Sequence, residues 1–311
     1  MSKFIRFFWI LVLLSGCSKG YQIESQTKAR VVATSTVVCD LAKTIAQDTI
    51  DLDCLIKPGQ DPHEYVPTPI DRRAFESSDL ILYSGYNFEK GLIIPINSDD
   101  NVGEKVAVGE LAVPKPQIFS DDGKITNDPH IFHDARNGAA MARIVEQSLI
   151  KLKPENRKRY EKAADHLIGQ LNKIDTWIKK EIATIPMQQR RLITTHDAYG
   201  YFSTAYNIPI EGALQGVSTD EKPTAQRIKQ LVEIIKKNKV PSIFVELTIN
   251  PKLLNAVATE SKAKVWSKQL YGDGLGAIGS AGDTYPKMLI SDTINIVEGL
   301  GGKVTKPLLN N

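Results

Sequence analysis

Short apolar runs rich in β-branched residues alternate with amphipathic stretches along most of the chain. The apolar runs predict strands near residues 30–36, 50–56, 80–84, 191–195, 242–246 and 264–267. Helical periodicity predicts helices near residues 38–47, 70–78, 135–151, 224–238, 251–261 and 285–300. Strands that alternate with helices in this way predict an α/β fold, with parallel sheets covered by helices.

A longer helical pattern occupies the middle of the chain. It opens at Pro154 and reaches about Ala183, with Pro186 just beyond, and prolines at these places are usual start and stop signals. One buried stripe is predicted at Ala163, Leu167, Leu171, Ile174 and Ile178. We therefore predict two α/β lobes joined by one long helix, with the lobes at 30–153 and 186–311 and the helix at 154–185.

The amino terminus has the features of an export signal. Lys3 and Arg6 precede the apolar run 7–14, which is too short to span a bilayer and is followed by small residues. The sequence Leu14-Ser15-Gly16-Cys17 resembles the lipobox of bacterial lipoproteins, in which the cysteine is acylated. We predict a signal peptide at 1–16, lipid on Cys17 and a tether at 17–29; the alternative is an ordinary signal peptide with an incidental cysteine.

Charge and cysteine content narrow the class of protein. Loss of the signal peptide takes the formal net charge from +3 to +1, so the mature chain has no basic footprint for nucleic acid. Cys39 and Cys54 could form a disulfide in an oxidising compartment, but sequence alone does not show that their geometry permits it. The spacings of structural zinc modules are absent.

The tripeptide Asp-Pro-His occurs twice, ending at His63 and at His130, in a chain with only 5 histidines. Proline stiffens each loop, and imidazole is the commonest metal ligand among side chains. His196 directly follows a predicted strand, and Asp283 closes the Gly-rich loop 271–282. Three neutral imidazoles and one carboxylate suit a divalent transition metal such as Zn²⁺ or Mn²⁺. With two ligands from each half, the ion would lie in the cleft between the lobes.

Each candidate ligand has a structural alternative. A single loop histidine is usually solvated, and Asp283 alone is typical of a helix N-cap. His133 could reach the same ion, but we favour a supporting or surface role for it, and we interpret His166 as structural. Asp61 and Asp128 could accept hydrogen bonds from ligand imidazoles, or from nearby backbone.

The chain resembles the metal-specific solute-binding lipoproteins of bacterial ABC transporters, the zinc, manganese and iron receptors called cluster A or TroA-like. The residues that carry the resemblance run over the whole mature chain in order: 31–35, 59–69, 128–130, 194–202, 215–219, 244–246 and 282–285. The resemblance implies two pseudo-symmetric lobes, a rigid linking helix, and metal ligands His63, His130, His196 and Asp283 in the cleft. It also implies a protein that performs no chemistry, anchored by Cys17 to the periplasmic face or the cell surface.

The resemblance further implies that the protein, expected to be a monomer, delivers Mn²⁺, Zn²⁺ or Fe²⁺ to a membrane permease. Many manganese-preferring relatives have Glu where this chain has His196, and many zinc receptors have a His-rich loop that residues 115–127 lack. Family members usually show Trp-Leu where Phe132 and His133 stand. The resemblance thus leaves the metal open.

Two other functions need weighing. A zinc-dependent hydrolase could use the same histidines, but the His-Glu-x-x-His spacing is absent and Asp283 would fill the open position of a catalytic zinc, so we predict no enzymatic activity. A nucleotide site is suggested by residues 274–279, which fit Gly-x-Gly-x-x-Gly. That match lies late in the chain and opens no βαβ unit, so a loop that brings Asp283 to the ion is the better interpretation.

Overall fold

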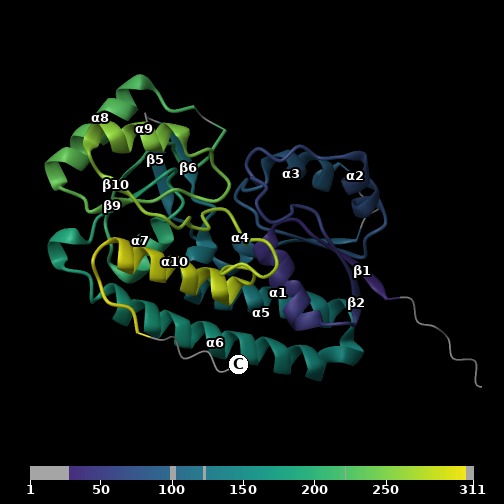
Figure 1. The fold of residues 1–311 in the computed structure, drawn as a ribbon. Helices are drawn as coiled ribbons and strands as arrows, with labels where there is room; N and C mark the ends of the chain where they lie inside the picture. The colour runs from purple at the N-terminus through teal and green to yellow at the C-terminus, as the bar shows by residue number, and fades with distance from the viewer. Residues whose placement is uncertain (1–27, 99–102, 122–123, 221, 306–311) are drawn as a thin grey trace, which may run out of the picture.

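The computed structural model describes residues 28–98, 103–121, 124–220 and 222–305. The predicted signal peptide, Cys17 and nearly all of the predicted tether lie outside the described residues. The rest confirms an α/β fold of two lobes with one long helix beneath both (Figure 1). Within the described residues, no helix combines the length and the apolar character needed to cross a bilayer.

The N-terminal lobe is built on a parallel sheet with the strand order β2-β1-β3-β4. Its strands are β1 (Ala29–Ala33), β2 (Ile50–Cys54), β3 (Leu80–Tyr83) and β4 (Glu104–Ala107). Its first helices are α1 (Thr36–Ala46), α2 (Pro69–Glu76), α3 (Lys90–Asn97) and α4 (Val108–Ala112). A short antiparallel hairpin follows, formed by β5 (Ile118–Asp121) and β6 (Lys124–Asn127).

Both faces of this sheet are buried, as parallel strands require. Side chains alternate across a strand, so Val31 faces one layer and Val32 the other. Val31 packs in the large core that includes residues of α1, α5 (Ala135–Leu152) and α6 (Arg157–Ile182), whereas Val32 packs with residues of α2 and α3. The carboxyl ends of the strands are thereby left free to carry loops to a site.

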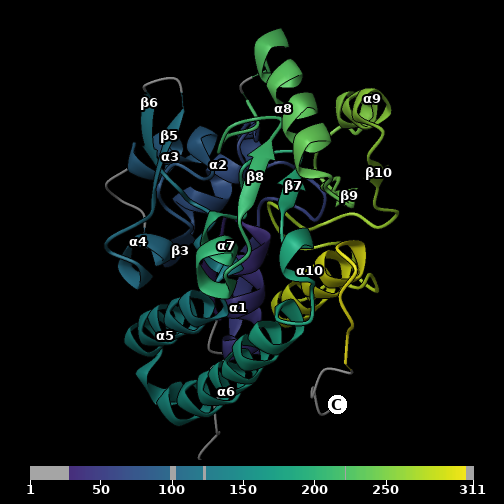
Figure 2. The same cartoon turned by 90° about the vertical axis from the view of Figure 1, so that its left-hand side faces the viewer.

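Helix α6 is the predicted linking helix. It packs against α1 and α5 of the first lobe and against α10 (Tyr285–Gly299) of the second half, and Figures 1 and 2 show it running beneath both. Its buried stripe matches the predicted one except at the first position. Ala164 is buried and Ala163 only partly so, because Tyr160 extends the stripe towards the amino end of the helix.

The C-terminal lobe has two parallel strand pairs. The strands are β7 (Leu192–Thr194), β8 (Ile210–Ala213), β9 (Ser242–Ile243) and β10 (Lys264–Val265), and the helices are α7 (Gly200–Tyr206), α8 (Ala225–Asn238) and α9 (Lys252–Ser261). The Phe244 amide donates to the Ile193 carbonyl at 2.9 Å and joins the two pairs. Ile193, Ile243, Leu231 and Leu254 centre a separate core.

A disulfide joins Cys39 on α1 to Cys54 at the end of β2, with the Cα atoms 5.7 Å apart. The sequence left this pairing open. Its effect is to tie the first helix of the N-terminal lobe to the neighbouring strand, just ahead of the loop that carries His63.

Candidate metal centre

His63, His130 and His196 converge on the carboxylate of Asp273, and all four side chains are buried. Asp273 Oδ1 lies 3.3 Å from Nε2 of both His63 and His130, and 3.1 Å from Nε2 of His196. The Nε2 atoms of His63 and His196 lie 3.2 and 3.4 Å from that of His130. Four potential ligand atoms thus surround one point.

These separations fit a metal ion. An ion held tetrahedrally at about 2.0–2.1 Å, as Zn²⁺ is by imidazole and carboxylate, keeps its ligand atoms about 3.3–3.4 Å apart. Asp273 Oδ1 is buried and has no hydrogen-bond partner among the described residues. A buried carboxylate needs positive charge beside it, and a cation bound at this point would supply that charge.

Three of the predicted ligands are where the sequence analysis placed them, at the ends of elements. His63 follows β2 through the turn 57–60, and His130 precedes the 3₁₀ turn Ile131–His133. His196 follows β7 directly. Two stiff Asp-Pro-His loops and one strand end therefore aim three imidazoles at the same cleft.

The structure does not bring Asp283 into this cluster. Asp283 accepts a hydrogen bond from the Gly279 amide at 2.9 Å and pairs with Lys287 at 2.8 Å, one helical turn further on. It precedes Thr284, the N-cap of α10, so it is a loop-closing residue at a helix start. Asp273, ten residues earlier in the same Gly-rich loop, is the carboxylate beside the histidines.

Carboxylates hold two of the imidazoles by their other nitrogen. Asp128 Oδ1 accepts from Nδ1 of His130 at 2.8 Å and from its backbone amide at 2.9 Å. Glu246 Oε2 lies 2.6 Å from Nδ1 of His196, and its Oε1 accepts from the amide of His196. The hydrogen bond to Asp128 places the proton of His130 on Nδ1 and leaves its Nε2 free for a metal, and the charge of Glu246 favours the same arrangement for His196. Asp61 instead accepts from the backbone amide of His63 and from Thr219 Oγ1.

The cluster is strongly polarised in the absence of an ion. Burial opposes ionisation of Asp273, but the positive charge of the neighbouring histidines, His196 above all, holds its pKa well below the usual range. Burial lowers the pKa of His196, yet Asp273 and Glu246 outweigh it, so this pKa is raised well above 6.5. A bound cation would replace the protons that these imidazoles otherwise attract.

His133 is buried rather than at the surface. Its Nε2 lies 2.8 Å from the carbonyl oxygen of Gly272, the residue before Asp273, and burial lowers its pKa to about 3. The surface role, one of the two that the sequence analysis left open for His133, is therefore wrong. His166 is exposed on α6.

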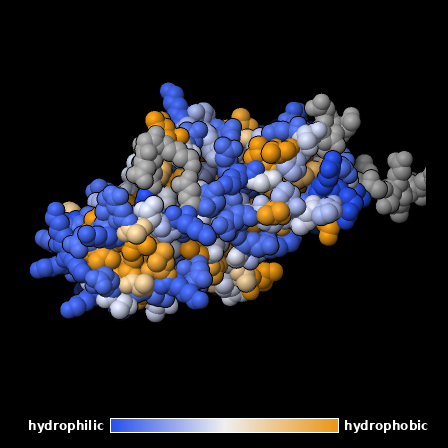
Figure 3. Space-filling view, turned by 90° about the horizontal axis from the view of Figure 1, so that it is seen from above, coloured by the Kyte–Doolittle hydropathy of each residue, from blue (hydrophilic) through white to orange (hydrophobic). Residues whose placement is uncertain are grey.

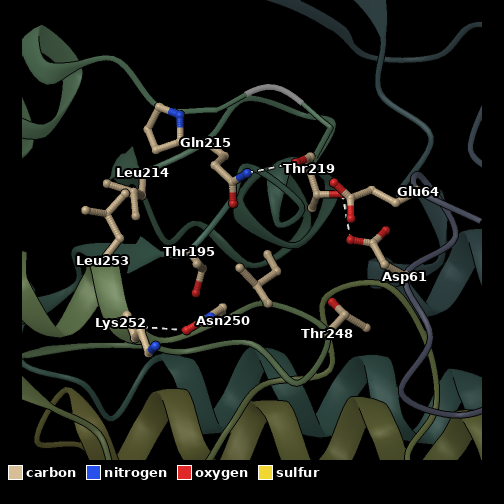
Figure 4. A pocket seen from close by; sticks show the side chains of 12 residues that line it. Asp61, Glu64, Thr195, Leu214, Gln215, Thr219, Thr248, Asn250, Lys252 and Leu253 are labelled. Atoms are coloured by element: carbon tan, nitrogen blue, oxygen red, sulfur yellow. Dashed lines mark hydrogen bonds between the residues drawn. The ribbon is translucent and has the colours of Figure 1, made fainter.

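A pocket of about 360 Å³ lies between the lobes, lined by residues that neighbour the cluster (Figure 4). Asp61 and Glu64 line it from the N-terminal lobe, and the remaining lining residues come from the C-terminal lobe. Thr195 lines it next to His196, and Thr248, whose hydroxyl donates to Asp273 Oδ2 at 2.7 Å, lines it beside the carboxylate. The lining of this pocket thus includes neighbours of His63, His196 and Asp273.

Known proteins resemble this chain over nearly its full length. Residues 31–299 match the family described as zinc-uptake complex component A, periplasmic (ZnuA). The manganese ABC transporter substrate-binding lipoprotein PsaA of Streptococcus mitis is 32% identical over 304 residues, which cover 96% of this chain and 97% of that protein.

Two solved structures share the fold. The periplasmic zinc-binding protein TroA from Treponema pallidum superposes with a TM-score of 0.83 at 31% identity, covering 88% of this chain and 99% of that one. Fe(III)-bound YtgA from Chlamydia trachomatis gives 0.81 at 26% identity, covering 90% of this chain and all of that one, 100%. Because the agreement extends through both lobes and the helix between them, this chain belongs to the ZnuA family of metal-binding, substrate-binding proteins of ABC transporters.

Proposed function

We propose that this protein captures one divalent transition-metal ion outside the cytoplasm on His63, His130, His196 and Asp273, and delivers it to the permease of an ABC transporter. The observation that carries the proposal is the convergence of the four side chains: Asp273 Oδ1 is buried 3.1–3.3 Å from three imidazole nitrogens. The family, and relatives named for manganese, zinc and iron, support the same function.

We infer that the site favours a four-coordinate ion, and Zn²⁺ fits it best. Thr248 donates a hydrogen bond to Asp273 Oδ2 at 2.7 Å, which favours Oδ1 as the carboxylate donor. Three imidazoles and one carboxylate oxygen complete a tetrahedron, the coordination that Zn²⁺ adopts most often. Mn²⁺ is the second candidate, because the PsaA relative is named for manganese. This ion prefers more oxygen ligands than the site offers.

The set of four clustered residues also argues against a zinc-dependent hydrolase. A catalytic zinc keeps an open position for water, whereas Asp273 occupies the fourth position here. The Gly-rich loop is accounted for by its delivery of Asp273 to the histidines. Neither the hydrolase nor the nucleotide interpretation gains support from this arrangement.

The export signal and Cys17 support a lipid-anchored protein at the periplasmic face of a bacterial membrane or at the cell surface. The PsaA relative is likewise named a lipoprotein. Figure 3 shows hydrophobic residues in separate patches on one, otherwise hydrophilic, face, and we propose that the protein is a monomer. Replacement of Cys17 by Ser should move the protein from the membrane fraction to the soluble fraction; retention in the membrane would contradict the anchor.

Calorimetric titration of metal-stripped residues 18–311 with Zn²⁺ and with Mn²⁺ tests the central proposal. One tight site per chain is expected, with Zn²⁺ displacing Mn²⁺. Absence of binding for either ion would overturn the function, and a Mn²⁺ affinity equal to that for Zn²⁺ would overturn the four-coordinate assignment. Zinc binds more tightly than manganese at most nitrogen-containing sites, so affinity alone does not identify the cargo. A comparison of Zn²⁺ and Mn²⁺ uptake by cells with and without the protein then decides it.

A further inference from the structure

His133 is a buried polar side chain that supplies no ligand atom to the cluster. It ends the 3₁₀ turn Ile131–His133, three residues after His130, and is 1% exposed. Its ring is stacked at a tilt against Tyr199, with centroids 4.3 Å apart, and against Phe132 at 4.7 Å. Both neighbours are themselves fully buried, so the imidazole is fixed in position and orientation.

The fixed imidazole directs one hydrogen bond at the backbone beside Asp273. A carbonyl oxygen only accepts, so Nε2–H of His133 donates to Gly272 at 2.8 Å. Gly272 also lies close to Glu246: a Cβ atom on Gly272 would be only 2.0 Å from Glu246 Oε2. The peptide before Asp273 is therefore in contact both with His133 and with the Glu246–His196 pair.

Further bonds hold the loop on either side of this peptide. The Tyr271 amide donates to Asp292 at 3.0 Å, and the Leu275 amide donates to Thr36 Oγ1 at 2.9 Å. Asp292 in turn accepts from the hydroxyl of Tyr199, on which the His133 ring is stacked. Thr36 and His133 belong to the N-terminal half, so that half holds a loop that the C-terminal half contributes.

We propose that His133 is a positioning residue for metal capture: by holding the Gly272 carbonyl it sets the Asp273 carboxylate against the three ligand imidazoles. The inference rests on the proposed metal-binding function. The carboxylate reaches the cluster from a Gly-rich loop, which has little rigidity of its own. Loss of the His133 bond would let the loop relax and move Oδ1 away from the point that the imidazoles share.

The test compares His133→Leu, which removes the donor at similar volume, with His133→Gln, whose amide nitrogen reaches the position of Nε2. Zn²⁺ affinity is expected to fall about 10–100-fold in H133L, the usual range for loss of a partner behind a ligand, and to stay near wild type in H133Q. The absorption spectrum of bound Co²⁺ should change in H133L alone. A purely structural role would instead lower the melting temperature of the metal-free protein and leave the spectrum of the folded protein unchanged.

A double-mutant cycle shows whether His133 acts through Asp273. In a D273A background, H133L should cause little further loss of affinity, because the carboxylate that it positions is gone. An equal loss in both backgrounds, or wild-type affinity and spectrum in H133L, would overturn the proposal. His166→Leu, at the exposed histidine of α6, is the control for the substitution itself.

If H133L does not fold, His133→Asn replaces it, because its shorter amide does not reach Gly272. Equal affinities for H133N and H133Q would then count against the proposal. Failure of the wild-type protein to bind Zn²⁺ is a different result, since it would remove the proposed function itself.

Discussion

At the scale of single residues, the decisive distinction is between two aspartates of one loop. Asp273 and Asp283 lie ten residues apart in a Gly-rich segment, and the sequence favoured Asp283 through its Gly-Asp-Thr-Tyr context. The path of a Gly-rich loop depends on tertiary contacts that no local pattern encodes. Only the structure shows that Asp273 closely follows Leu270, which forms an isolated parallel bridge with Glu246.

Asp273→Asn should abolish tight Zn²⁺ binding, with a loss greater than the roughly 10–100-fold cost of losing a supporting partner. The amide cannot supply the negative charge that the three imidazoles surround. Asp283→Asn is the matched control and should bind as wild type, because Asp283 contacts Lys287 and the Gly279 amide. Calorimetry measures both, and the reverse result would restore Asp283 as the ligand.

Glu246→Gln isolates the role of a carboxylate behind a ligand. Gln keeps an oxygen to accept from the Thr195 and His196 amides, so the metal-free protein should melt near the wild-type temperature. Its NH₂ group, however, would face Nδ1 of His196 and favour the proton on Nε2, the wrong tautomer for a metal. We expect Zn²⁺ affinity to fall about 10–100-fold. Unchanged affinity would show that Glu246 serves the fold alone.

At the scale of secondary-structure elements, the sequence predicted the long helices and the apolar strands well. α5, α6 and α10 have strong periodicity and end near the predicted residues. It missed elements with weak patterns, among them the edge strand β4, which begins with two charged residues, and the β5–β6 hairpin. The predicted strand 242–246 was also longer than β9. Residues 244–246 form separate hydrogen bonds with neighbouring segments instead of a regular strand ladder.

The disulfide between α1 and β2 offers a prediction at this scale. The Cys39→Ser/Cys54→Ser double variant should be less stable by about 3 kcal/mol, the value expected for a closed loop of this size, whose ends are 15 residues apart. Its Zn²⁺ affinity should match the wild type, since neither cysteine belongs to the metal cluster. Urea denaturation of the metal-free proteins measures the difference. Equal stability would mean that packing of α1 alone secures this part of the lobe.

At the scale of the whole molecule, the two lobes are joined by more than the linking helix. Asp61 accepts from Thr219 at 2.7 Å, and Lys90 pairs with Asp220, both across the cleft. The Tyr285 amide, at the start of α10, donates to Asp40 of α1 at 2.8 Å. The sequence predicted two lobes and a site between them. It could not show these contacts, because each depends on how the lobes are placed.

Global stability should depend on pH through Asp292. Burial raises its pKa from 3.8 to about 8, so between these values the folded protein holds a proton that the unfolded chain has released. Stability from this group is therefore complete below about pH 4 and is lost as the pH rises through about 8. Asp292→Asn should flatten the fall in unfolding free energy of the metal-free protein between pH 5 and 8. Parallel curves for variant and wild type would contradict the assignment.

The spacing of the clustered residues along the chain has a consequence for when the ion can be bound. His63 and His130 are 67 residues apart, His130 and His196 are 66 apart, and Asp273 follows near the end. An unfolded chain thus offers no neighbouring pair of these donors, so tight binding arises only together with the tertiary structure. A chain that crosses the membrane unfolded would leave the cytosolic metal pool untouched and would load its first ion only after it has folded outside.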